Sequence, residues 1–205
     1  MKTILVIMGT LFVAGCSVFG IRTSEEPPFE VLVEESNIEI RQYSDMLVAE
    51  TEIVADYEES TKIGFRRLAG YIFGKNASQK EIAMTAPVVQ KKENEKIAMT
   101  APVLQQQADK KWVMSFVLPS AYTMETLPKP LDDKVLIKTV PGKKVASISY
   151  TGFLSEEKFL KKAQQLKQWL ETNQYAALSE PRSAGYDPPW TIPFLRRNEV
   201  LIDVQ

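Results

Sequence analysis

Side chains that commonly carry out catalysis or bind metals are scarce in this sequence. Its 205 residues include no histidine and one cysteine, Cys16, whereas aspartate and glutamate together number 26. Nucleophile systems that need histidine, histidine-bearing zinc sites and a disulfide within the chain are therefore excluded. Carboxylate chemistry stays possible, but the acidic residues fall mostly in expected turns and on helix faces, where solvated surface is their ordinary role. The sequence therefore predicts no catalytic residue, no metal site and no enzyme activity.

The surroundings of Cys16 indicate lipid attachment. Residues 4–14 form an apolar run, which is shorter than the roughly 20 residues of a membrane-spanning helix and is typical of a signal peptide. The motif Val13-Ala14-Gly15-Cys16 resembles the lipobox of bacterial lipoproteins, in which the cysteine thiol receives a diacylglyceryl group and cleavage precedes the cysteine. Ordinary secretion with a free Cys16 is the alternative.

The resemblance to lipoproteins implies a location as well as a modification. We expect residues 1–15 to be a signal peptide and residues 16–29 a lipidated tether that reaches on the order of 20 Å if flexible. Ser17, in place of an aspartate after the cysteine, resembles lipoproteins that are sorted to the outer membrane. We therefore expect a protein anchored to the membrane through Cys16, in the bacterial cell envelope, facing the periplasm.

A seven-residue word, Ile-Ala-Met-Thr-Ala-Pro-Val, occurs twice, at residues 82–88 and 97–103. Each copy is rich in strand-forming residues, and the stretch between them is polar, so a strand, a turn and a second strand are predicted. A register that pairs Met84 with Val103 and Val88 with Met99 gives one apolar face that contains both methionines. The prolines require edge strands or bulges. This hairpin is predicted to form a soft apolar ligand wall, and an ordinary core face is the alternative.

The rest of the composition favours one folded domain over residues 30–205. The formal net charge is −1 and no basic block is present, so nucleic acid is not expected as a partner, and the sequence identifies no protein partner. One helix is expected to begin after the N-cap Asp56 and to end at Gly74. A second helix is expected after the N-cap Ser155, and its buried face is predicted to consist of Phe159, Ala163, Leu166 and Leu170. Strands are expected within residues 30–41 (two short strands), 46–55, 112–118, 134–140, 145–151 and 198–204.

This order of elements contains strand, helix, strand, strand twice, so the chain is interpreted as internally duplicated. We expect an α+β fold, with a distorted and mostly antiparallel β-sheet or β-barrel and two helices. Several short sequence motifs occur in the order known from one family, the SOUL haem-binding proteins. The chain resembles that family from about Phe29 to its end. The words are both copies of the repeat, Tyr71–Asn76, Met114–Pro119, Tyr186–Trp190 and Arg196–Val200.

The resemblance implies a distorted barrel built from two repeated halves, with a largely apolar haem or tetrapyrrole site beside the first helix. An axial histidine proposed for some relatives has no counterpart here, so iron ligation would fall to Met, Tyr or water. The resemblance places Arg66 and Arg67 on this helix, where either guanidinium could pair with a haem propionate or lie on a solvated face. The residues carried over are Phe65, Arg66, Arg67, Leu68, Tyr71, Met84 and Met99.

Two functions remain open from the sequence. The first is non-catalytic binding or carriage of haem, a porphyrin or a similar flat amphipathic molecule at the envelope, mainly through an apolar groove. The second is an interaction or structural module of the envelope that keeps the fold without a small ligand. Trp190 is interpreted as part of a rigid turn, with the rim of a ligand groove as the alternative. Arg196 and Arg197 have the same two alternatives as the arginines of the first helix, and Glu199 could simply pair with one of them.

Overall fold

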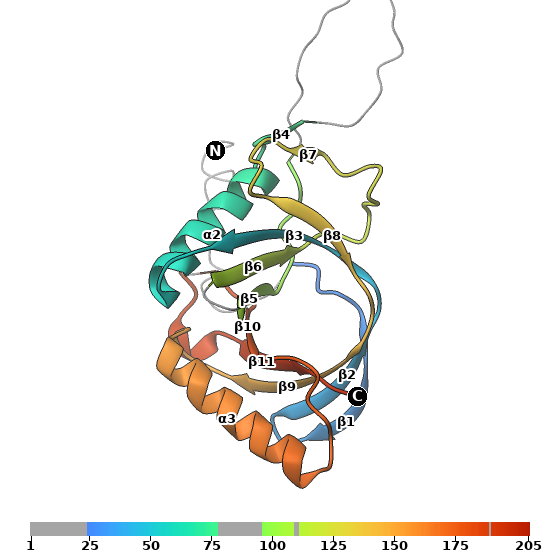
Figure 1. The fold of residues 1–205 in the computed structure, drawn as a ribbon, viewed down its shortest axis with the longest axis vertical. Helices are drawn as coiled ribbons and strands as arrows, with labels where there is room; N and C mark the ends of the chain where they lie inside the picture. Colours follow the sequence, from blue (N-terminus) through green and yellow to red (C-terminus); the bar gives the residue numbers. More distant parts are fainter. Residues whose placement is uncertain (1–23, 78–95, 109–110, 189) are drawn as a thin grey trace, which may run out of the picture. The chain divides into compact units, whose positions relative to one another are not determined.

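The computed structural model describes residues 24–77, 96–108, 111–188 and 190–205 (Figure 1). The predicted signal peptide, Cys16, Met84 and the first copy of the repeat lie outside these residues. The described chain divides into two compact units. Of the described residues, those within Glu25–Phe29 and Tyr43–Lys143 form unit 2, and Ser24 with those within Glu30–Gln42 and Lys144–Gln205 forms unit 1. Unit 1 is thus assembled from stretches that precede and follow unit 2 in the sequence.

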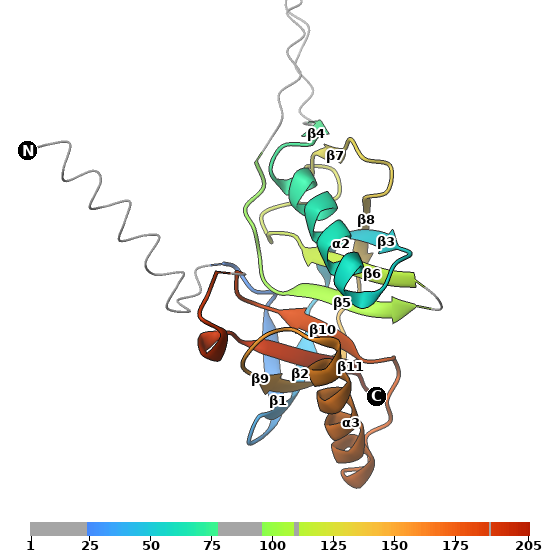
Figure 2. The same cartoon turned by 90° about the vertical axis from the view of Figure 1, so that its left-hand side faces the viewer.

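Unit 2 is a four-stranded antiparallel arrangement with one long helix. The strands lie in the order β5-β6-β3-β8, and α2 packs against β3 and β6 (Figure 2). A short pair, β4 and β7, is separate from these four strands. The bounds are β3 Met46–Ile53, α2 Tyr57–Ile72, β4 Asn76–Ala77, β5 Val103–Ala108, β6 Lys111–Val117, β7 Lys129–Pro130 and β8 Leu136–Val140.

Unit 1 has five strands and the second long helix. Its strands lie in the order β1-β2-β9-β11-β10, with β2, β9, β11 and β10 antiparallel, and α3 packs against β9 and β11. The bounds are β1 Phe29–Glu35, β2 Ile38–Tyr43, β9 Lys144–Tyr150, α3 Glu156–Thr172, β10 Arg182–Gly185, a 3-10 turn η1 Pro193–Leu195, and β11 Asn198–Asp203. Within the described ranges, no helix is long and apolar enough to cross a membrane.

Both units follow one plan, which confirms the predicted duplication. In unit 2 the order is β3, α2, β5, β6, and the last strand pairs with the first. In unit 1 the order is β9, α3, β10, β11, and the last strand again pairs with the first. Each helix buries its apolar face in a hydrophobic cluster of its own unit. The α+β class with two helices on mostly antiparallel strands is therefore confirmed.

Local sequence explains where the helices begin and which face is buried. The Asp56 carboxylate accepts the Glu59 N–H at 2.8 Å, and the Ser155 hydroxyl accepts the Lys158 N–H at 3.4 Å, so both predicted N-caps are confirmed. The predicted apolar stripe of α3 is also confirmed as core. Its members are Phe159, Ala163, Leu166 and Leu170.

The predicted hairpin is wrong at its second arm. Residues 97–102 form no strand, and β5 begins only at Val103, which pairs with Phe116 of β6. The backbone of this segment instead bonds to irregular partners: the Ile97 N–H donates to the Ile72 carbonyl at 2.8 Å, and the Ala101 N–H to the Glu25 carbonyl at 2.9 Å. Because these amides are used elsewhere and Pro102 has no N–H, the segment cannot continue a strand ladder.

Candidate functional site

The exposed side of α2 carries aromatic side chains. Phe65 is 37 % exposed, and Phe73, which caps the helix, is 59 % exposed. Ala69 lies between them, and a spacing of four residues places successive side chains on neighbouring positions of one helix face. We call Phe65, Ala69 and Phe73 the α2 strip. Phe65 is also anchored, because its ring lies edge-on to Phe116 with 5.5 Å between centroids.

Two predicted site residues on the same helix belong to the core. Leu68 is 0 % exposed and Tyr71 is 1 % exposed, and both pack in the hydrophobic cluster of unit 2. The Tyr71 hydroxyl donates to the Pro128 carbonyl at 2.9 Å. A ligand on the helix surface therefore has no access to either side chain, since both point toward the strands.

The two arginines of α2 differ in their surroundings. Arg67 donates from Nη1 to the Thr51 hydroxyl at 2.6 Å, and its Nε lies 3.5 Å from an Asp132 carboxylate oxygen. Arg66 is exposed and has no ion-pair or hydrogen-bond partner within the described part of the chain. Arg66 is therefore the arginine of this helix whose guanidinium is available to an anionic ligand group.

The second copy of the repeat runs beside the C-terminal end of α2. Ile97 is hydrogen-bonded to the last residue of the helix and is buried in the same cluster as Leu68 and Ile72. Met99 is half-buried against this cluster, and Ala98 is exposed. The structure thus brings Met99 next to the helix that carries the α2 strip, whereas Met84 lies outside the described residues.

A small cavity also lies in unit 2, and its lining includes Thr100, which follows Met99, but none of the described predicted site residues. Its volume is about 190 Å³, and its lining includes Glu25, Leu47, Leu118 and Tyr122. Hydrogen bonds from Ser120 hold the pKa of the Glu25 carboxyl below its ordinary value, so the cavity carries a negative charge at neutral pH. The volume is below the roughly 300 to 1,000 Å³ of pockets that enclose drug-sized ligands, so this cavity does not enclose a tetrapyrrole.

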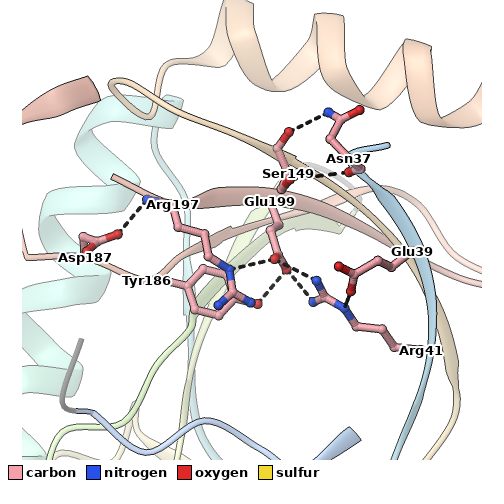
Figure 3. Close-up of polar contacts among 8 residues, drawn as sticks. All are labelled: Asn37, Glu39, Arg41, Ser149, Tyr186, Asp187, Arg197 and Glu199. Carbon is pink, nitrogen blue, oxygen red and sulfur yellow. Dashed lines mark hydrogen bonds and ion pairs between the residues drawn. The ribbon is translucent and has the colours of Figure 1, made fainter. Parts of the chain in front are cut away.

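Unit 1 contains a buried cluster of charged side chains around Glu199 (Figure 3). Arg41 donates two hydrogen bonds to the Glu199 carboxylate, from Nη1 at 2.8 Å and from Nη2 at 2.9 Å. Arg197 Nε donates to the same carboxylate at 2.9 Å, and the Tyr186 hydroxyl also donates to it, at 2.7 Å. Arg41 also binds Glu39, with 2.6 Å between Nε and Oε2. Glu199 is 0 % exposed and Arg41 3 %, so the centre of this network is buried, whereas Glu39 and Arg197 at its ends are partly exposed.

The network joins two of the sequence words. Arg197 and Glu199 come from the Arg196–Val200 word, and Tyr186 and Asp187 come from the Tyr186–Trp190 word. The Asp187 carboxylate accepts the Arg197 N–H at 2.6 Å, and the Arg197 guanidinium lies 3.9 Å from the centre of the Tyr186 ring. Of the alternatives left open for Arg196 and Arg197, the structure shows Arg197 paired with Glu199. The role of Arg41 was not predicted.

The arrangement around Glu199 stabilises the fold rather than offering a reactive group. Two arginines face two carboxylates, Glu39 and Glu199, so the charges balance within the cluster. Every Glu199 oxygen accepts hydrogen bonds from this chain. In the described ranges, no group of three or more histidine, cysteine or carboxylate side chains is arranged to hold a metal ion.

The pKa of Glu199 predicts a pH dependence of stability. Burial raises this pKa, but the hydrogen bond and charge of Arg41, the charge of Arg197 and the Tyr186 hydroxyl outweigh burial and leave it below its ordinary value of 4.5. A carboxyl whose pKa is lower in the folded state stabilises the fold above its unfolded pKa, and this contribution is lost as the pH falls through the folded pKa.

We therefore expect the wild-type protein to exceed a Glu199→Gln variant in unfolding free energy most strongly at neutral pH. The difference between the two proteins should shrink steadily below pH 4.5, because protonated Glu199 resembles glutamine. Urea unfolding at pH 7 and at a series of lower pH values measures the difference. A difference that stays constant across this range would show that Glu199 keeps its proton state.

Comparisons with known proteins agree with the sequence words. The family model described as SOUL heme-binding protein matches residues 24–94 and 89–203. The chain is 28 % identical over 166 residues to heme-binding protein 1 of Xenopus tropicalis, and the match covers 79 % of the chain and 80 % of that protein. Heme-binding protein 1 of Xenopus laevis is 27 % identical over the same length, with the same shares covered.

Solved structures with similar folds are more distant in sequence. The C-terminal domain of EcmrR matches with a TM-score of 0.55 at 13 % identity, covering 86 % of this chain and 98 % of that one. A hydrolase from Listeria innocua matches with a TM-score of 0.54 at 12 % identity, covering 85 % of this chain and 94 % of that one. At such identities the likeness concerns the fold alone.

Proposed function

The chain belongs to the SOUL heme-binding protein family, and from this premise we propose that it binds haem or a related flat tetrapyrrole on the exposed side of α2. The proposed binding is non-catalytic and takes place at the bacterial cell envelope. Family membership supports haem as the ligand class. The position on α2 is supported by the exposed aromatic side chains of that helix.

One observation carries the proposed position. The α2 strip presents Phe65 and Phe73 to solvent on the same helix as Arg66, whose guanidinium has no partner in the described ranges. Aromatic rings of the protein can stack on a flat conjugated ligand, and a guanidinium binds a carboxylate such as a propionate through two parallel hydrogen bonds. A flat, apolar ring with acidic substituents suits this combination of side chains.

The residues present favour binding by shape and stacking over binding by coordination. The sequence contains no histidine, and Tyr71 already donates its hydroxyl within the core. Met99 is half-buried against the cluster that contains the end of α2, whereas Met114, which packs against Gly64 of the same helix, is 1 % exposed. Haem iron accepts methionine in some proteins, so Met99 would be the residue to hold it. The ligand would lie on a surface, since the small cavity of unit 2 does not enclose it.

The proposed location rests on the N-terminal sequence. A lipidated Cys16 followed by a short tether would hold the domain close to the membrane, at the outer membrane facing the periplasm. The mass of the N-terminal peptide of the purified protein measures this directly. A peptide that begins at Cys16 and carries acyl groups supports the anchor, and a free Cys16 contradicts it.

Haem binding is tested by titrating haemin into a chain that spans Ser17–Gln205, which contains every described helix and strand. We expect a saturable shift of the Soret band at micromolar haemin, with quenching of tryptophan fluorescence. Replacing Phe73 by Ala should weaken binding about tenfold, because it removes one stacking ring worth on the order of 1.4 kcal/mol.

The matched control is Leu160→Ala, which removes an equally exposed apolar side chain from α3 of unit 1. This variant should bind haemin as tightly as the wild type. Absence of any saturable shift in the wild type would contradict haem binding and favour the alternative, an envelope interaction module without a small ligand. Equal losses in both variants would contradict the assignment to α2.

A further inference from the structure

Unit 1 exposes an aromatic surface that the proposed ligand site does not use. Three rings are largely solvent-exposed: Phe153 at 58 %, Trp190 at 64 % and Phe194 at 69 %. We call these three residues the aromatic patch. Scattered exposed apolar side chains need no explanation, but a group of large aromatic ones commonly marks an interaction site.

The patch comes from two loops that are tied together. The Gly152 N–H donates to the Pro193 carbonyl at 2.8 Å, and Asn198 Nδ2 donates to the Gly152 carbonyl at 2.9 Å. These bonds fix the residue before Phe153 against the residue before Phe194. The rings therefore project from a built platform, part of which is the short 3-10 turn η1 seen in red at the edge of unit 1 in Figure 2.

Arg196 links the third ring to the other two. Its Nε donates to the Thr191 carbonyl at 2.8 Å, directly after Trp190, and its guanidinium carbon lies 4.9 Å from the centre of the Phe153 ring. Lys158 adds a second cation, because its ammonium lies directly over Gly152. Aromatic rings flanked by long cationic side chains are typical of surfaces at the boundary between lipid and water.

We propose that the aromatic patch inserts into the headgroup layer of the bilayer to which the chain is tethered. This inference rests on the proposed lipid anchor at Cys16. The tether between Cys16 and Glu25 reaches on the order of 20 Å if flexible, so the domain stays within range of that bilayer. A bilayer also requires no shape complementarity, which suits rings that protrude from loops better than a partner that needs a groove.

Apolar contact carries this binding more than charge does. Glu156 and Glu157 lie in the first turn of α3 beside Lys158, so the cations near the patch are partly offset. The interaction should therefore survive in zwitterionic lipid and depend weakly on salt, unlike the attraction of a polybasic segment to anionic lipid.

The experiment uses the full lipidated protein, reconstituted into phosphatidylcholine vesicles with or without bromine on the acyl chains. Bromine quenches tryptophans that enter the bilayer. Trp190 is exposed, whereas Trp112 is 7 % exposed and Trp169 packs in unit 1, so quenching should report Trp190. We expect a loss of fluorescence in brominated vesicles and a blue-shifted emission, and both should vanish in Trp190→Phe. The double variant Phe153→Ser, Phe194→Ser should also lose the quenching, whereas the exposed control Leu178→Ser should keep it.

Absence of bromine-dependent quenching while the protein floats with the vesicles would overturn the proposal, as would equal quenching in Trp190→Phe. A protein that proves to carry no lipid would contradict the anchor separately, and flotation of that unlipidated chain then tests the patch. If the double variant lowers the vesicle affinity of this unlipidated chain by about tenfold or more, the result supports insertion. Burial of one large apolar side chain accounts for a factor of this size. Failure to float overturns the proposal. Haemin binding should be unchanged in the double variant, so the two proposals fail independently.

Discussion

Replacing Glu199 by Gln is expected to lower the free energy of unfolding by about 3–5 kcal/mol at neutral pH, because it removes the buried carboxylate that Arg41 and Arg197 share and leaves Arg41 with Glu39 alone. Arg41 is 3 % exposed and Glu199 0 %, so water cannot replace the lost carboxylate. The glutamine keeps the shape of the side chain, and the loss therefore reports charge rather than packing. Urea unfolding followed by far-UV circular dichroism gives the midpoint and slope from which the change is calculated.

The matched control is Glu180→Gln, which removes a carboxylate of the same unit from an exposed pair with Lys167. Exposed pairs contribute little, so no resolved change is expected there. If Glu199→Gln does not fold, the double variant Arg41→Met, Glu199→Met still tests the argument. Apolar replacement of a buried pair is often neutral, so the double variant should be more stable than Glu199→Gln alone. Equal losses in Glu199→Gln and Glu180→Gln would contradict a coupled buried network.

Replacing Leu68 by Ala is expected to lower the free energy of unfolding by about 2–5 kcal/mol, through lost burial and the cavity left behind. Leu68 is 0 % exposed and packs in the hydrophobic cluster of unit 2, so water does not fill the space that the removed side chain leaves. Because it faces the strands, the folded variant should bind haemin as the wild type does. Leu68→Ala and Phe73→Ala should thus separate stability from binding on one helix.

Leu160→Ala again serves as control, since it makes the same substitution at a leucine that is 58 % exposed on α3. Its unfolding free energy should change by less than about 0.5 kcal/mol, as expected for surface substitutions. Thermal and urea unfolding at saturating and zero haemin measure both effects. A Leu68→Ala variant of normal stability with weakened haemin binding would place Leu68 in the ligand site instead of the core.

The helices could be predicted because their signals are local. Asp56 and Ser155 precede acidic first turns, and a cap needs only the next three residues to form. The apolar stripe of α3 repeats at helical spacing, so its buried face follows from periodicity alone. The strand order within each unit has no such local signal.

Contacts between distant residues could not be predicted from the sequence. Arg41 lies on β2 and Glu199 on β11, and both strands are antiparallel neighbours of β9. The two side chains meet only when both strands have paired with β9. Strand β10 has the sequence Arg-Ser-Ala-Gly, which lacks the branched and aromatic residues typical of strands. The second copy of the repeat looks like a strand, but its amides bond to α2 and to Glu25 instead.

The predicted ligand residues divide according to the turn of α2. The motifs shared with the family place the site beside this helix but do not indicate which face of the helix is exposed to a ligand. Leu68, Tyr71 and Ile72 follow the spacing of a buried face, which is where the structure has them. Phe65, Arg66 and Phe73 lie on the outer side, and Phe73 was not among the predicted residues. Phe73 lies within the predicted helix and within the Tyr71–Asn76 motif, but the resemblance carried no ligand role over to it.

The interrupted sequence of unit 1 has a consequence for the order in which the chain can fold. A chain that emerges from its N-terminus completes unit 2 once Lys143 is available, whereas β2 must wait for β9, whose first residue is Lys144. Until then β1 and β2 have an unpaired edge, and such edges favour association between chains. Loss of the C-terminal strand β11 would leave β9 paired with β2 alone, whereas β3, β5, β6 and β8 of unit 2 all precede β9 in the chain. Vectorial synthesis thus exposes one half of the duplicated plan to misassembly for longer than the other.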